Sequence, residues 1–125
     1  MPAANPEDVN LLMGEALSSG NLDAAMDLYE ADAAFVPQPG QIVIGPAVRD
    51  AVKAFIALKP QLHIEVTSVT RSGDLALLTS SWTLDGTGPD GSALKMSGRG
   101  TEVVRQQPDG SWRFAIDNPY GAPEA

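Results

Sequence analysis

The chain has 125 residues, the length of one domain with a substantial core, so we expect a single domain over residues 1–125. Sixteen acidic against eight basic residues give a formal net charge of −8, which disfavours nucleic acid and anionic membranes as partners. The absence of cysteine excludes disulfides and thiolate chemistry. No apolar run approaches the roughly 20 residues that a membrane helix needs, and the N-terminus lacks the regions of a signal peptide. We therefore expect a soluble, cytoplasmic protein.

The first half of the sequence predicts three helices. The first lies within residues 5–20, where a capping residue and a proline precede apolar residues at helical spacing. The second begins at Asn21, which can cap it, and its apolar positions continue to Tyr29. The third lies within residues 45–60, between a glycine-proline start and a closing proline.

Strands are expected around and after the third helix. Two short ones are predicted at residues 35–36 and 42–44. From residue 62 onward the apolar period changes from about 3.6 to 2, which is typical of strands. The predicted strands begin at Leu62 and then cover residues 75–84, 94–105 and 111–118. Three helices followed by an antiparallel meander predict an α+β fold with the helices on one face of the sheet.

Alternation along these strands separates an apolar face from a polar face. The apolar face, which the helices must cover, collects Leu62, Ile64, Val66, Ala76, Leu78, Trp82, Leu84, Leu94, Met96, Val104, Trp112, Phe114 and Ile116. The other face is rich in threonine, serine and arginine and includes His63, the only histidine. Such a polar face is either solvated or a polar contact between the sheets of a dimer, and the sequence leaves both alternatives open.

Three residues on the apolar face break its pattern. Gly98 and Gly100 stand where a strand interior normally avoids glycine, which indicates a bend, a bulge or space left for a neighbour. Glu102 follows on the same face, where an acid must be hydrogen-bonded, paired or in a wet cavity. Asn118 shares this face at the end of the last strand. These residues predict a lined cavity, whereas a single bulge would instead turn Glu102 outward.

Other chemical signals are weak. A metal site would need further histidines or clustered acids around His63, and no such spacing is visible. Residues 86–91 match the dinucleotide fingerprint G-x-G-x-x-G, but a strand follows them instead of a helix, so we interpret them as a hairpin loop. We therefore expect no metal and no cofactor.

Several short motifs resemble those of the SnoaL-like, ketosteroid-isomerase-like domains of the nuclear-transport-factor-2-like superfamily. They are Gly-Asn-Leu-Asp at residues 20–23, Leu-Tyr at 28–29, Ala-Asp-Ala at 31–33, Gly-Pro-Ala at 45–47, Asp-Gly-Ser-Trp-Arg at 109–113 and Ile-Asp-Asn at 116–118. The resemblance implies a cone-shaped fold, with three N-terminal helices packed on a strongly curved, mostly antiparallel sheet that encloses a pocket. It also implies a homodimer formed through the sheet. Members include isomerases, cyclases and dehydratases as well as non-enzymatic association modules, so the fold does not settle the function.

The sequence departs from the family's steroid-isomerase pattern, in which two carboxyls are held at different pKa values. The position of the family's base falls here on Pro37 or Gln38, and neither can take a proton. The family's tyrosine on the first helix falls at about Met13, and a histidine found near the end of the last strand in related domains is Asn118. Only the second acid has a counterpart, roughly at Glu102. Isomerisation by the steroid-isomerase dyad is therefore not expected.

Two functional hypotheses remain. In the first, a pocket binds a small apolar organic molecule, Glu102 acts as general acid or base, and Gln38 and Asn118 position a carbonyl. The expected pocket residues are Met13, Tyr29, Phe35, Gln38, Trp82, Glu102 and Asn118. In the second, the domain is a non-catalytic module for ligand binding, dimerisation or association. A scaffold whose cone is filled by Trp82 or Phe114 is a third alternative.

Overall fold

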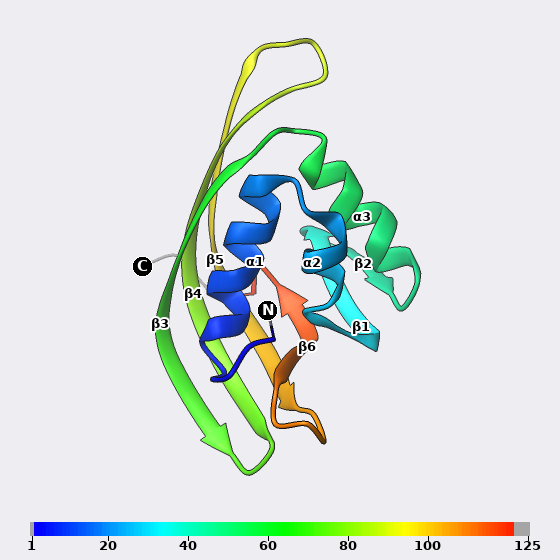
Figure 1. Ribbon diagram of the computed structural model, residues 1–125. Coiled ribbons are helices and arrows are strands. Elements are labelled where there is room, and N and C mark those ends of the chain that lie inside the picture. Colours follow the sequence, from blue (N-terminus) through cyan, green and yellow to red (C-terminus); the bar gives the residue numbers. More distant parts are fainter. Residues whose placement is uncertain (1, 122–125) are drawn as a thin grey trace.

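The computed structural model describes residues 2–121, and these form three helices and a six-stranded sheet. The elements follow one another as α1 (Asp8–Ser19), α2 (Leu22–Met26), β1 (Tyr29–Gln38), β2 (Gln41–Ile44), α3 (Ala47–Ile56), β3 (Gln61–Ser72), β4 (Leu75–Thr87), β5 (Ala93–Gln106) and β6 (Trp112–Asn118). The helices lie together on one side of the long β3–β4–β5 ribbon (Figure 1). The expected α+β class, with three N-terminal helices, is confirmed.

The sheet order is β2-β1-β6-β5-β4-β3. Every neighbouring pair is antiparallel except β1 and β6, which run parallel. The last strand of the chain therefore lies between β1, from the N-terminal half, and β5 of the meander. This placement brings residues that are distant in the sequence onto one patch of the inner sheet face.

The connection from α1 through α2 to β1 is only partly as the sequence predicts. Gly20, with a φ of 72°, ends α1, and its N–H donates to the carbonyls of Ala16 and Leu17. Asn21 caps α2 by accepting a hydrogen bond from the N–H of Ala24 at 3.0 Å. However, α2 ends at Met26, and Tyr29 begins a ten-residue strand instead of continuing a helix. The strand predicted at residues 35–36 is confirmed but is longer than expected, because pairing with β6 overrides the helix propensity of this alanine-rich segment.

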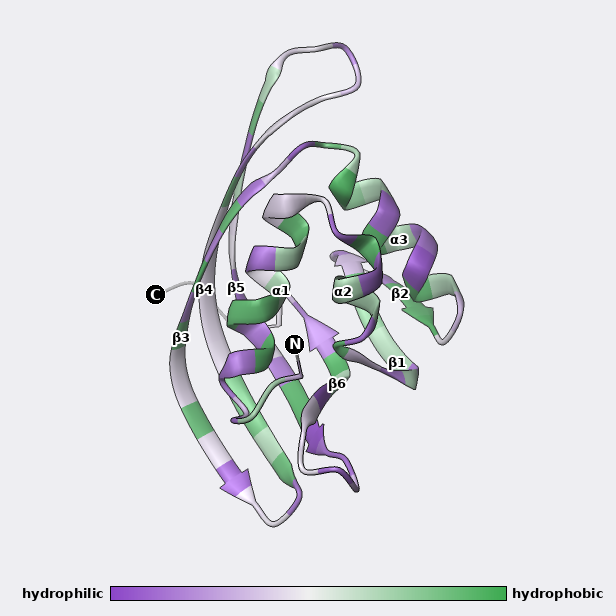
Figure 2. Ribbon diagram, viewed as in Figure 1, coloured by the Kyte–Doolittle hydropathy of each residue, from purple (hydrophilic) through white to green (hydrophobic). Residues whose placement is uncertain are grey.

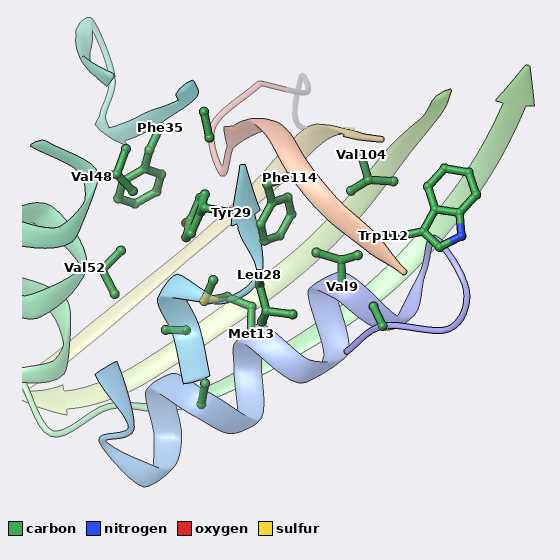
Figure 3. Packing of buried hydrophobic residues seen from close by; sticks show 14 of the residues in the cluster. Val9, Met13, Leu28, Tyr29, Phe35, Val48, Val52, Val104, Trp112 and Phe114 are labelled. Carbon is green, nitrogen blue, oxygen red and sulfur yellow. The ribbon is translucent and has the colours of Figure 1, made fainter. Parts of the chain in front are cut away.

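The core lies between the helices and the inner face of the sheet (Figure 3). Trp112 and Phe114 on β6, Leu78 on β4 and Val9 on α1 are among its largest fully buried side chains. Burying side chains of this kind contributes about 1.5–3 kcal/mol each. The predicted apolar strand face thus packs under the helices along most of its length.

A bulge changes the faces of β6. The β5–β6 register shifts between Val103, which pairs with Ile116, and Val104, which pairs with Phe114. The extra residue, Ala115, reverses the alternation that follows it. Ile116 is therefore 45% exposed, whereas Asp117 is buried. The expectation that Ile116 and Asn118 share the covered face was wrong for this reason.

None of the helices within residues 2–121 is long and apolar enough to cross a membrane.

Candidate functional site

A cavity of about 70 Å³ lies between the helices and the inner sheet face. By volume it has room for several water molecules or a small organic group. Its walls are mostly apolar and come from α1, α3, β1, β3, β4, β5, β6 and the residues just after β6. The polar side chains among them are Asn10, Tyr29, Ser80, Glu102, Asp117 and Tyr120.

Glu102 on β5 is 2% exposed. Its Oε1 accepts a hydrogen bond from Nδ2 of Asn10, on α1, at 2.5 Å. The same oxygen accepts a second one from Oγ of Ser80, on β4, at 2.8 Å. Its Oε2 has no hydrogen-bond partner among residues 2–121. Burial raises the pKa of this carboxyl, and the two hydrogen bonds oppose the rise. The structure thus places Glu102 on the inner face.

Glycines make space for this arrangement. A Cβ at Gly100 would lie 2.8 Å from Oγ of Ser80 and would overlap Oε2 of Glu102. At Gly98, a Cβ would lie 2.8 Å from Cζ2 of Trp82. Both glycines pair directly with the residues they accommodate, Gly100 with Ser80 and Gly98 with Trp82, across β4 and β5. The close approach of these side chains therefore explains two glycines in a strand interior.

A second buried acid, Asp117, lies beside Glu102. The two residues are register partners across β5 and β6, and Phe35 of β1 pairs with Asp117 on its other side. Oη of Tyr29 donates to Oδ2 of Asp117 at 2.6 Å. Burial raises the pKa of Asp117 to about 7; the hydrogen bond from Tyr29 opposes this rise, and the charge of Glu102 adds to it. Burial, and then the charge of Asp117, raise the pKa of Tyr29 as well.

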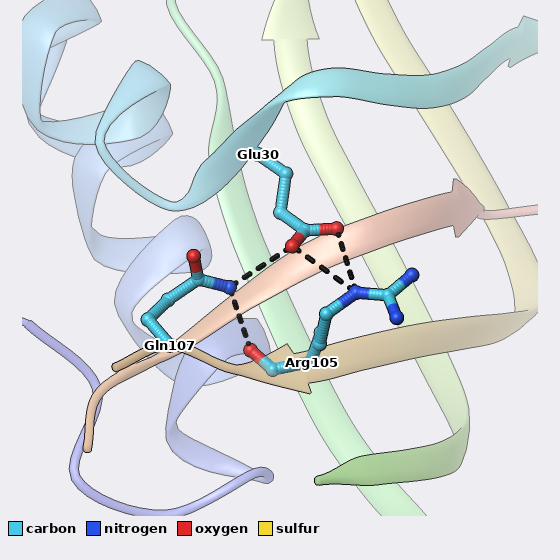
Figure 4. A network of polar contacts seen from close by, with 3 residues as sticks. All are labelled: Glu30, Arg105 and Gln107. Atoms are coloured by element: carbon cyan, nitrogen blue, oxygen red, sulfur yellow. Dashed lines mark hydrogen bonds and ion pairs between the residues drawn. The ribbon is translucent and has the colours of Figure 1, made fainter. Parts of the chain in front are cut away.

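An ion-pair network holds the start of β1, next to Tyr29 (Figure 4). Glu30 pairs with Nε of Arg105 at 3.2 Å and accepts a hydrogen bond from Nε2 of Gln107 at 3.0 Å. Because β6 lies between β1 and β5, this contact spans β6. The Arg105 side chain is 47% exposed, so the pair contributes at most about 1 kcal/mol. The pair links the start of β1 to the end of β5.

Trp82 and the segment after β6 close one side of the cavity. The indole Nε1 of Trp82 donates to the carbonyl of Pro119 at 2.7 Å. The Tyr120 ring meets the indole edge-on, with ring centroids 5.7 Å apart. Trp82 is 7% exposed and lines the cavity without filling it.

The structure brings five of the seven expected pocket residues together. Met13, Tyr29, Phe35, Trp82 and Glu102 all line the cavity. The other two, Gln38 and Asn118, are not part of its lining.

Gln38 is exposed at the end of β1, and Oδ1 of Asn118 accepts a hydrogen bond from the N–H of Tyr120 at 3.2 Å. The bulge at Ala115 turns Asp117 toward the cavity in place of Asn118. Strict alternation could not reveal that exchange. The parallel pairing of β1 with β6, which brings Tyr29 near Asp117, also left no signal in the sequence.

The remaining sequence motifs lie outside the cavity. His63 is exposed on β3, and the glycine-rich residues 86–91 fall at the end of β4 and in the turn before β5. Within residues 2–121, no group of three histidines, cysteines or acids is arranged to hold a metal ion.

Known proteins share the fold of this chain. The model of the SnoaL-like domain family matches residues 12–115. No curated protein sequence matches the chain.

Solved structures share the fold at low sequence identity. A candidate dehydratase of the nuclear-transport-factor-2-like family from Streptomyces avermitilis has a TM-score of 0.78 and 19% identity, with 93% of each chain covered. A ketosteroid isomerase-like protein from Erwinia carotovora atroseptica has a TM-score of 0.73 and 18% identity, covering 90% of this chain and 89% of the other. A candidate calcium/calmodulin-dependent protein kinase type II association domain from Thiobacillus denitrificans has a TM-score of 0.76 and 19% identity over 98% of each chain. At these identities the likeness shows the fold alone.

Proposed function

This chain belongs to the SnoaL-like domain family, and we propose that it binds a small, mostly apolar organic molecule and moves a proton on it. The observation that carries the proposal is the pair of buried carboxyls, Glu102 and Asp117, in register on neighbouring strands at the cavity wall. Met13, Phe35 and Trp82 provide apolar wall around them. Pockets of this composition orient apolar ligands through a few polar groups.

The two carboxyls have different hydrogen-bond environments. Glu102 accepts two hydrogen bonds on one oxygen, which favours its ionised form, whereas Asp117 accepts one, from Tyr29. With a pKa of about 7, Asp117 keeps its proton in part of the molecules near neutral pH, and we propose that Asp117 is the acid of the pair and Glu102 the carboxylate. Such a pair supplies a base and an acid within one site.

The chemistry that follows is proton transfer next to a carbonyl. The Glu102 carboxylate takes a proton from the carbon beside the carbonyl, the C–H electron pair moves into the enolate, and the charge develops on its oxygen. The protonated carboxyl of Asp117 is the donor for that oxygen. Isomerisations, dehydrations and cyclisations that pass through an enolate begin with this step. Among the structural neighbours are proteins named as a candidate dehydratase and as ketosteroid isomerase-like, which supports the choice.

Hydrogen–deuterium exchange tests the proposal without knowledge of the natural substrate. A panel of small apolar ketones is incubated with the protein in D₂O, and loss of the α-proton signal is followed by NMR. We expect catalysed exchange of at least one ketone and a loss of about 100-fold or more in Glu102→Gln. Glu65→Gln, which removes an exposed acid of β3, is the matched control. Equal exchange rates in Glu102→Gln and wild type would exclude Glu102 as the base.

A row of apolar residues on the outer sheet face supports a second candidate function, association. Register pairs join Ile44, Ala34, Ile116, Val103 and Leu77 across five strands. Ile44 is 61% exposed, Ile116 45% and Leu77 44%. Figure 2 shows the hydrophobic edge strand β2 at one end of this row. An exposed apolar row of this kind marks an interaction surface, and we propose that two copies of the chain pair through it.

Sedimentation equilibrium tests the association. The wild type should be a dimer, and Ile116→Lys should be a monomer because it places a charge in the middle of the row. Thr83→Lys, at another exposed position of the same outer face but outside the row, is the control. A monomeric wild type would contradict the pairing. A dimer that exchanges no ketone would instead favour the association module over the enzyme.

A further inference from the structure

We propose that the cavity selects for positive charge: it binds a small organic ammonium with an apolar body in preference to a neutral or anionic molecule of the same shape. The inference rests on the proposed function only in placing a ligand in this cavity. It names the chemical class of that ligand.

The wall of the cavity is acidic. Glu102 and Asp117 both line the cavity, and none of the described residues that line it is a lysine, an arginine or a histidine. The carboxyl of Glu102 is held by neutral donors, and its Oε2 has no hydrogen-bond partner among residues 2–121. A buried carboxylate without a cation is costly, and an ammonium that donates to it would offset that cost. A carboxylate or phosphate ligand would instead face a charge of its own sign.

Aromatic rings also line the cavity. Tyr29, Phe35 and Phe55 form a chain of rings along one side, with successive centroids 6.1 and 6.0 Å apart. Trp82 and Tyr120 form a second pair where the residues after β6 close the cavity. Aromatic faces attract organic cations most strongly where water is excluded. A cavity with aromatic walls and an acidic group has the composition of an ammonium site.

Ammonium binding has a consequence for the proton-transfer chemistry. An ammonium that donates to Glu102 occupies the carboxylate that the proposed function uses as its base. An apolar amine should therefore compete with ketones for the cavity. The ammonium keeps its proton, so no covalent step is involved.

Three single-ring probes of matched size test the selectivity: benzylamine, benzyl alcohol and benzoate, titrated into the protein at neutral pH by calorimetry. We expect benzylamine to bind about tenfold or more tightly than benzyl alcohol, and benzoate to bind most weakly. This order is measured on the wild type and needs no variant. Equal binding of the amine and the alcohol, tighter binding of benzoate, or no binding of any probe would overturn the proposal.

Variants then test whether the carboxylate of Glu102 is the group that binds the ammonium. In Glu102→Gln the affinity for benzylamine should fall about tenfold or more, while that for benzyl alcohol should change less than about threefold. Glu65→Gln removes the same formal charge from an exposed position and should leave both affinities unchanged. An equal loss of amine binding in both variants would assign the selectivity to the overall charge of −8 and refute the cavity site.

The outcomes separate this inference from the proposed function. Amine selectivity without ketone exchange upholds the ammonium site and overturns the enzyme. Ketone exchange without amine selectivity does the reverse. If both hold, benzylamine should slow ketone exchange competitively.

Discussion

Replacing Asp117 by asparagine should make the protein more stable at alkaline pH. Burial raises the pKa of Asp117 from 3.8 to about 7, so the folded state disfavours the ionised form. Below the unfolded pKa of 3.8 both states hold the proton, so the acid does not lower the free energy of unfolding. As the pH rises from there through the folded pKa of about 7, ionisation favours the unfolded state and the free energy of unfolding falls. A shift of this size corresponds to at most about 4 kcal/mol of unfolding free energy by pH 8.

Asparagine has nearly the same shape and can still accept the hydrogen bond from Tyr29, but it cannot ionise. We expect Asp117→Asn to gain stability over the wild type as the pH rises from 4 to 8, with little or no gain at pH 4. Urea unfolding at pH 4, 6 and 8 measures the difference. Asp74→Asn, at an exposed turn, is the control. If the wild-type and Asp117→Asn curves stayed parallel between pH 4 and 8, Asp117 would not be a buried, protonated acid.

Three further substitutions test the contacts around the cavity. Gly100→Ala should lower the unfolding free energy by about 1–3 kcal/mol, because its Cβ would overlap the Glu102 carboxylate; an unchanged urea midpoint would contradict this. Tyr29→Phe removes the donor to Asp117 and should raise the pKa of that acid further in an NMR titration, whereas an unchanged or lower pKa would show that the hydrogen bond does not stabilise the carboxylate. Trp82→Phe removes the donor to the carbonyl of Pro119, after β6, and should speed hydrogen exchange of the amides in that segment; unchanged protection would show that the segment is held by other contacts.

The fold could be predicted because its local signals agree with one another. Asn21 at a helix start and Gly20 at a helix end each have the backbone role that their chemistry favours. Period-two alternation after residue 60 likewise identified the meander. The strand from Tyr29 to Gln38 was predicted too short because its alanines favour a helix. Its pairing with β6 depends on a strand about 80 residues away, which local patterns do not reveal.

The site was predictable only in part, for the same reason. Glu102 and Trp82 were visible because β4 and β5 pair in one unbroken register. Asp117 was missed in favour of Asn118, because one extra residue at Ala115 reverses the faces of β6. A bulge is decided by tertiary packing, and a single sequence carries no periodic trace of it.

A carboxyl titration by NMR tests the central claim most directly. With ¹³C-labelled aspartate and glutamate, Asp117 should titrate near pH 7 and Glu102 above its usual range, because both acids are buried at the cavity wall. In Glu102→Gln the pKa of Asp117 should fall, since the neighbouring charge is gone. If both acids instead titrated together with the exposed carboxyls of the surface, the two would not form a buried pair, and neither the proton transfer nor the ammonium site would stand.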